Sequence, residues 1–213
     1  MPSIHADVCA KCPSCGEEFD AQAWSFVRGD ENDDLRLALL YGEFNLLRCE
    51  KCSAFFHHEM PVVYFDPPTE LLVFILPSSC EAERGKWTAK MNEDFKALEK
   101  GLFREMKIDS VPLVFFGAEA VRGLLEAEQD MNDESDVIAA VAGEAGFKLK
   151  KMRPSYAREH SLPLYIPFAG DNCDRESVLK AAGQMLEGRC ELARLEALRK
   201  LLSDKKTVFP PLV

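Results

Sequence analysis

The sequence of 213 residues has no hydrophobic run that approaches the roughly 20 apolar residues of a membrane-spanning helix. The continuous apolar run Leu71–Leu76 has only the length of a strand. The first seven residues show neither the basic segment nor the apolar segment of a secretory signal peptide. We therefore expect a cytoplasmic protein, in which cysteine thiols stay reduced and bind metal more readily than they form disulfides.

Basic residues are also scarce, since 26 Lys and Arg stand against 36 Asp and Glu and give a net charge of −10. The imbalance is strongest in residues 1–66, which hold five basic and twelve acidic side chains. Proteins that bind nucleic acid neutralise phosphates with Lys and Arg, so binding of nucleic acid through this region is not expected. The one basic cluster, from Lys148 to Arg158, is more simply explained as a solvent-exposed strand face.

Motifs of catalysis are missing as well, because the sequence contains no Gly-rich phosphate loop, nucleophile elbow or Ser–His–Asp set. The run His57-His58-Glu59 differs from the zinc-protease pattern, and neighbours on a strand point to opposite faces. We therefore predict no catalytic residue. An enzyme, either a hydrolase or a thiol-dependent catalyst, is the alternative, and it would need a pocket in which His57, Asp66 and Cys80 converge.

What the sequence does contain is two Cys-x-x-Cys pairs among its eight cysteines. A two-residue spacer lets both sulfurs of a pair turn to one side, and two such pairs can surround one ion at Zn–S distances of about 2.3 Å. Four protein ligands leave no position for a substrate, so the expected site is a closed, structural zinc site; iron, with the same ligands, is the minor alternative. The predicted metal ligands are Cys12, Cys15, Cys49 and Cys52.

Two other interpretations compete for the first pair. Cys9 stands three residues before Cys12, so that Cys9 and Cys12 form a rival pair. Cys12-Pro13-Ser14-Cys15 is also similar to the redox motif of glutaredoxins, which begins a helix. Gly16 argues against a helix at this point and favours the turn of a zinc knuckle.

The periodicity along the chain predicts an α+β protein in three parts. Residues 1–66 are expected to form a four-cysteine zinc ribbon with an inserted short helix at Leu35–Tyr41. Residues 67–172, after Pro67-Pro68, are expected to form a mixed α/β body, with Leu71–Leu76 as a strand buried on both faces. Residues 173–213 complete the chain as a long C-terminal helix and a tail.

Helix boundaries in the second half of the chain follow from apolar spacing and from polar residues that could act as caps. One helix is expected from Gly117 to about Asp130, and a second from Asp133 or Ser135 to Ala142. An apolar stripe with a period close to four predicts a single helix from about Asp174 to Asp204. Because such a helix is long for a domain of this size, it could pair with a second copy or another protein.

Several segments together resemble the bacterial CpXC domain family. They are Cys-Pro-Ser-Cys-Gly at 12–16, Tyr-Gly-Glu-Phe-Asn at 41–45, the second cysteine pair at 49–52, and Met-Pro-Val-Val-Tyr-Phe-Asp at 60–66. The resemblance covers residues 7–66 and extends weakly to 111–128, and the second pair departs from it by lacking a proline. It implies a zinc-binding domain in the bacterial cytoplasm, and it implies no particular activity.

Taken together, the sequence predicts a zinc-binding structural or protein-interaction module without catalytic activity. The acidic surface, the closed metal site and the long amphipathic helix all favour contact with a protein partner or with a second copy.

Overall fold

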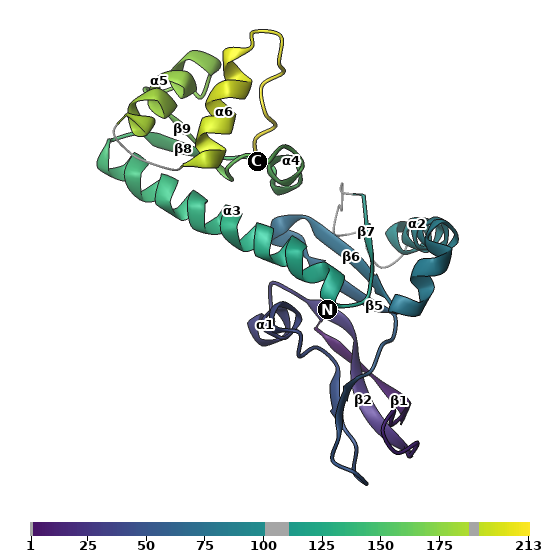
Figure 1. Ribbon diagram of the computed structural model, residues 1–213. Coiled ribbons are helices and arrows are strands. Elements are labelled where there is room, and N and C mark those ends of the chain that lie inside the picture. The colour runs from purple at the N-terminus through teal and green to yellow at the C-terminus, as the bar shows by residue number, and fades with distance from the viewer. Residues whose placement is uncertain (1, 101–110, 188–191) are drawn as a thin grey trace. The chain divides into compact units, whose positions relative to one another are not determined.

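The computed structural model describes residues 2–100, 111–187 and 192–213, and its internal contacts divide the chain into two units, Met1–Leu125 and Glu126–Val213 (Figure 1). The mixture of sheets and helices confirms the α+β class. The division into three parts at residues 66 and 172 stays a prediction.

A mixed five-stranded sheet in the order β1-β2-β5-β6-β7 organises the first unit. β1 and β2 are antiparallel, as are β5 and β6, while β2 runs parallel to β5 and β6 parallel to β7. A separate hairpin, β3–β4, branches from the chain between β2 and β5. The elements of this unit are β1 (Ile4–Lys11), β2 (Glu18–Arg28), α1 (Asp33–Tyr41), β3 (Leu46–Arg48), β4 (Phe55–His57), β5 (Val62–Asp66), the 3-10 turn η1 (Pro67–Thr69), β6 (Leu71–Leu76), the 3-10 helix η2 (Ser78–Glu83), α2 (Arg84–Lys100) and β7 (Leu113–Phe116).

The central strand β6 is buried along its whole length, which confirms the sequence-based prediction for Leu71–Leu76. Its side chains alternate between two cores because successive residues of a strand point to opposite faces. Leu71, Val73 and Ile75 belong to the core that contains Leu39 of α1. On the other face, Phe74 and Leu76 pack with Met91 of α2. The sheet is thus covered by helices on both faces.

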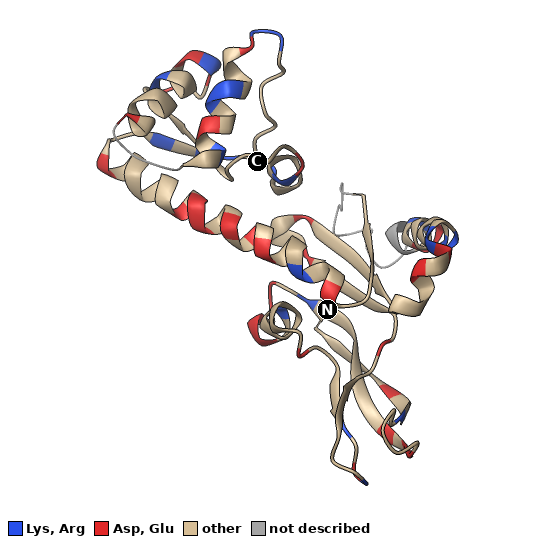
Figure 2. Cartoon of the chain, viewed as in Figure 1, with Lys and Arg blue, Asp and Glu red and all other residues tan. Residues whose placement is uncertain are grey.

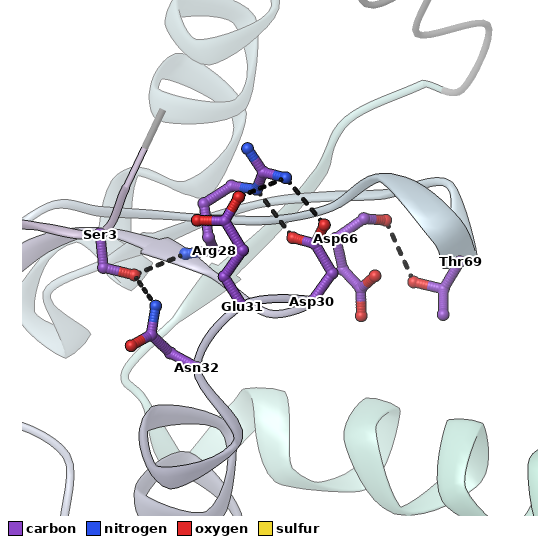
Figure 3. Close-up of polar contacts among 7 residues, drawn as sticks. All are labelled: Ser3, Arg28, Asp30, Glu31, Asn32, Asp66 and Thr69. Atoms are coloured by element: carbon purple, nitrogen blue, oxygen red, sulfur yellow. Dashed lines mark hydrogen bonds and ion pairs between the residues drawn. The ribbon is translucent and has the colours of Figure 1, made fainter.

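A network of polar side chains lies at the carboxyl end of β2, around Arg28 (Figure 3). The buried Arg28 donates from Nε to Asp30 at 2.7 Å and lies 3.1 Å from Glu31. The Arg28 hydrogen bond lowers the pKa of Asp30, whereas burial raises the pKa of Asp66. The next residue, Gly29, passes so close to the next strand of the sheet that a side chain has no room there.

The long helix α3 (Glu119–Glu144) corrects the prediction of two helices between Gly117 and Ala142. The polar residues that resemble a cap in the sequence make contacts across the fold instead. The hydroxyl of Ser135 donates to the Met131 carbonyl of the preceding turn and accepts the backbone N–H of Leu164. Glu134 accepts the backbone N–H of Arg194 at 2.7 Å. With these groups satisfied, nothing interrupts the helix at this point.

In the C-terminal region the prediction of a single helix from Asp174 to Asp204 is wrong. The structure has two helices there, α5 (Arg175–Leu186) and α6 (Ala193–Ser203). Glu187 ends α5 in an extended conformation, and the two helices pack against each other. The apolar stripe is buried in the core of this unit, where Val178, Met185, Leu195 and Leu198 lie. It is therefore not available to a partner.

The rest of the second unit is a small sheet with short helices around it. Its strands β8 (Lys148–Lys151) and β9 (Tyr165–Phe168) pair with each other, and α4 (Pro154–His160) lies in the segment of chain that connects them. The chain end adds one antiparallel bridge between Met152 and Leu212.

Acidic residues outnumber basic ones along α3, where eight Asp and Glu stand against one Arg (Figure 2).

Candidate metal centre

The two cysteine pairs lie in the turns of two hairpins. Cys12 and Cys15 are in the turn between β1 and β2, and Cys49 and Cys52 are in the turn between β3 and β4. In each turn the N–H of the first cysteine donates to the carbonyl five residues later, at 2.8 Å in the first turn and 2.9 Å in the second. In each, the N–H of the fourth residue after that cysteine returns to its carbonyl at 2.9 Å. The same local structure is therefore used twice.

This turn requires a left-handed residue after the second cysteine. Gly16 takes that conformation with φ of 75° in the first turn, as the sequence predicted. Ser53 occupies the equivalent place in the second turn with φ of 60°. A serine tolerates this conformation less easily than a glycine does, which explains why the second pair is harder to recognise as a knuckle.

The four sulfurs come together although 33 residues lie between the two pairs in sequence. All four Sγ atoms lie within 4.8 Å of one another. Cys12 Sγ is 3.6 Å from Cys52 Sγ, and Cys15 Sγ is 3.6 Å from Cys49 Sγ. A tetrahedron with Zn–S bonds of about 2.3 Å requires sulfurs about 3.8 Å apart, so the cluster fits a zinc ion.

Burial of the cysteines is asymmetric within each pair. The first members are enclosed, with Cys12 exposed by 1% and Cys49 by 0%, whereas Cys15 and Cys52 lie at the surface. An ion at the centre would be shielded by protein on one side and reachable from solvent on the other.

Proximity makes the four thiols compete for ionisation. Burial raises the pKa of Cys12, but the backbone N–H groups of Cys15 and Ser14 and the thiol of Cys52 together lower it to about 6. The Glu17 N–H lowers the pKa of Cys15, whereas burial and the neighbouring thiols raise it to about 12. Four adjacent thiolates repel one another unless a cation lies among them. The cluster thus favours a bound divalent ion.

Two further contacts connect the hairpins beside the cysteines. Lys51 donates from Nζ to Glu17 at 2.7 Å, which raises the pKa of Lys51. Phe19 of β2 and Phe56 of β4 meet edge to face with ring centroids 6.2 Å apart. Because the ion pair is exposed, it contributes little stability, and the sulfur cluster is the main candidate for holding the hairpins together.

The structure separates the competing interpretations of the first pair. Cys9 is exposed on β1 and is not part of the four-sulfur cluster, so the rival pair of Cys9 and Cys12 is not formed. The segment from Cys12 to Cys15 is a hairpin turn, and no helix begins there, unlike the arrangement in glutaredoxins.

The alternative of an enzyme predicted that His57, Asp66 and Cys80 converge. A pocket of about 260 Å³ does lie between the β3–β4 hairpin and the sheet, and His57 lines it. Asp66 lies instead beside Arg28 and Asp30 (Figure 3). Cys80 packs against the core that contains Met91. The three residues therefore do not form one site.

Comparison with known proteins agrees with the cysteine arrangement. The family model described as CpXC protein matches residues 10–140, which include both cysteine turns, the β3–β4 hairpin and the five-stranded sheet apart from Ile4–Cys9 of β1. The chain belongs to the CpXC family. The resemblance that the sequence motifs indicated is thereby confirmed, and for this CpXC chain the match continues beyond the cysteine region into α3.

Neither the curated proteins nor the solved structures include a match to this CpXC chain. None of the helices in the described part of the chain combines the length and hydrophobicity of a bilayer-spanning helix.

Proposed function

We propose that this chain is a zinc-binding structural module that makes contacts with proteins and has no catalytic activity of its own. The observation that carries the proposal is the cluster of four cysteine sulfurs at spacings that suit a tetrahedral ion. Bound zinc would supply four metal–sulfur bonds that cross-link the β1–β2 and β3–β4 hairpins, with no coordination position left for a substrate. Iron would use the same ligands.

Support for a contact surface comes from the β3–β4 hairpin. Phe55 is exposed by 66%, and Leu46 lies on the same face of the hairpin with 40% exposure. Arg48 lies over the Phe55 ring at 6.0 Å. Exposed aromatic and arginine side chains of this kind are enriched at protein interfaces. A small hairpin also needs the metal to hold this surface in shape, which connects zinc with recognition.

The acidic character of the chain restricts the class of partner. A nucleic-acid backbone would be repelled by this charge, whereas a protein surface that carries basic groups would be attracted. We propose the cytoplasm as the compartment, because four free thiols require a reducing environment to remain available for metal.

Elemental analysis of the purified protein tests the metal. We expect one zinc ion per chain, and a chelator should release it together with the structure of the two hairpins. A preparation that folds normally with no transition metal would contradict the proposal.

Sizing by light scattering and retention of proteins on the immobilised chain test the contact role. We expect a partner or a second copy to bind, and Phe55→Ser should weaken that binding with the zinc content unchanged. A strictly monomeric chain that retains no protein would contradict the interaction role and leave the metal role standing.

A further inference from the structure

We propose that the pocket at the carboxyl ends of β6 and β7 binds a primary ammonium group carried on a short apolar stem. These two parallel strands end side by side, and the chain continues from them into η2 and α3. Crevices beyond the carboxyl ends of parallel strands are frequent ligand sites in α/β proteins. The volume of about 260 Å³ lies just below that of typical sites for drug-sized molecules, so the ligand must be small.

Apolar side chains form most of the wall and provide a place for the stem. They come from the loop after α1, from the entrance of β5 and from the ends of β6 and β7. They are Phe44, Met60, Val62, Ile75, Leu76 and Phe116.

Glu59 supplies the recognising charge. Its Oε2 accepts two hydrogen bonds from Ser78, one from the backbone N–H at 3.0 Å and one from the hydroxyl at 2.7 Å. Both bonds use the same oxygen and fix the carboxylate in place. Oε1 lies on the side of Gly117, 3.8 Å from where a Cβ of that residue would be. Among the described residues, none donates a hydrogen bond to Oε1.

The charges around the pocket favour a cation. The described residues that line the pocket include no Lys or Arg. Glu119, the other acid of the lining, is paired with Arg122, whose Nη1 lies 2.8 Å from its Oε1. The amino end of α3 contributes only about half a positive charge, and Glu119 in its first turn opposes that charge. Glu59, which is exposed to solvent, therefore has no Lys or Arg partner among the described lining residues, and an anion would be repelled.

His57 adds a second acceptor. Its Nδ1 lies 3.2 Å from the carbonyl oxygen of Phe44. Since a carbonyl can only accept, Nδ1 carries the hydrogen, and in the uncharged form of the ring Nε2 is the nitrogen that accepts. A primary ammonium has three donors and can use several acceptors at once, whereas a hydroxyl has one donor and no charge. The pocket thus distinguishes an amine from an alcohol of the same shape.

Calorimetric titration of the full chain with benzylamine, benzyl alcohol and benzoate tests this selectivity. We expect benzylamine to bind at least about tenfold more tightly than benzyl alcohol, because a charge-assisted hydrogen bond replaces a neutral one. Benzoate should show no binding. The ammonium can belong to a free amine or to a lysine side chain, so n-butylamine and Nα-acetyl-lysine methylamide are titrated in parallel. Binding of both shows that the pocket admits the lysine side chain of a protein, and binding of butylamine alone assigns a free amine.

Glu59→Gln isolates the decisive group. The amide oxygen can still accept both hydrogen bonds from Ser78 while the charge is lost, so the variant should fold, with a melting temperature lowered by no more than a few degrees. We expect it to bind benzylamine at least about tenfold more weakly and benzyl alcohol within about twofold of the original chain. The matched control is Glu83→Gln, which removes the same charge from η2 outside the pocket lining and should leave both affinities unchanged.

Three results would overturn the proposal. One is benzylamine binding that Glu59→Gln leaves intact, the second is equal binding of benzoate and benzylamine, and the third is no binding of any amine at millimolar concentration. Zinc content is measured on each preparation, so that loss of the metal centre is distinguished from failure of the pocket.

Discussion

Replacing Cys49 by Ser gives the most direct test of the metal centre. Cys49 is completely buried, and its sulfur lies 3.6 Å from that of Cys15. The serine hydroxyl ionises far less readily than a thiol and sits on a shorter bond, so the ion would lose one of four ligands. The backbone hydrogen bonds of the turn, from Cys49 N–H to Ala54 and from Ser53 N–H to Cys49, would remain possible.

The magnitude follows from the share of one ligand. Structural zinc sites in small modules have apparent binding free energies of about 10–16 kcal/mol, so each of four sulfurs accounts for roughly 2.5–4 kcal/mol. Zinc affinity should therefore fall by about 10²–10³-fold. At a fixed free zinc concentration that saturates the original chain, the stabilisation by zinc should fall by a similar free energy.

The assay is competition for zinc with a chromophoric chelator, followed by thermal unfolding with and without the metal. Cys9→Ser is the matched control, because Cys9 is exposed on β1 and lies outside the sulfur cluster. It should leave zinc affinity unchanged. If Cys49→Ser kept full affinity, or if Cys9→Ser lowered affinity as strongly, the assignment of the four ligands would be wrong.

Four further substitutions test the fold. Gly29→Ala should lower the free energy of unfolding by about 1–3 kcal/mol, because the new Cβ would lie 2.2 Å from the hydroxyl oxygen of the buried Tyr64. Gly123→Ala, the control on the open surface of α3, should raise the free energy of unfolding by up to about 1 kcal/mol. Asp30→Asn should lower the free energy of unfolding by about 1–2 kcal/mol at pH 7. Because the pKa of Asp30 in the folded chain lies below its unfolded value of about 3.9, the stabilisation by this carboxylate is present above that pH. It disappears as the pH falls through the folded pKa. Arg175→Ala should cost about 2 kcal/mol, because its guanidinium caps the carbonyls at the end of α6.

Chemical denaturation measures each of these changes, over pH 2–8 for the aspartate variant. A stable Gly29→Ala chain would mean that the two strands are not packed as closely as described. A pH-independent effect of Asp30→Asn would show that its ion pair does not persist in solution. An unchanged stability of Arg175→Ala would mean that water satisfies the carbonyls equally well.

Local patterns in the sequence were sufficient where one segment contains all the information. The run Leu71–Leu76 is apolar at every position, and such a strand can only be buried on both faces. The conformation of the turn at each cysteine pair is likewise determined locally, because the two-residue spacing and, in the first turn, Gly16 define the knuckle. The family resemblance followed from these same residues.

Helix boundaries were wrong where a distant residue decides the structure. In the sequence Ser135 has the features of a helix cap. In the fold its hydroxyl accepts a hydrogen bond from the backbone N–H of Leu164, and α3 continues through this position. The stripe of the C-terminal region is periodic throughout, and only the packing of α5 against α6 requires a break after Leu186. Neither partner can be read from local spacing.

The sequence by itself therefore determined the class of the fold, the family and the four candidate ligands, since these depend on residue types at short spacing. Only the tertiary structure decided that the four sulfurs meet, that Cys9 does not join them, and that Glu59, Ser78 and His57 line one pocket. Contacts between residues far apart in the chain depend on how strands pair and turns close, and no local pattern encodes that pairing.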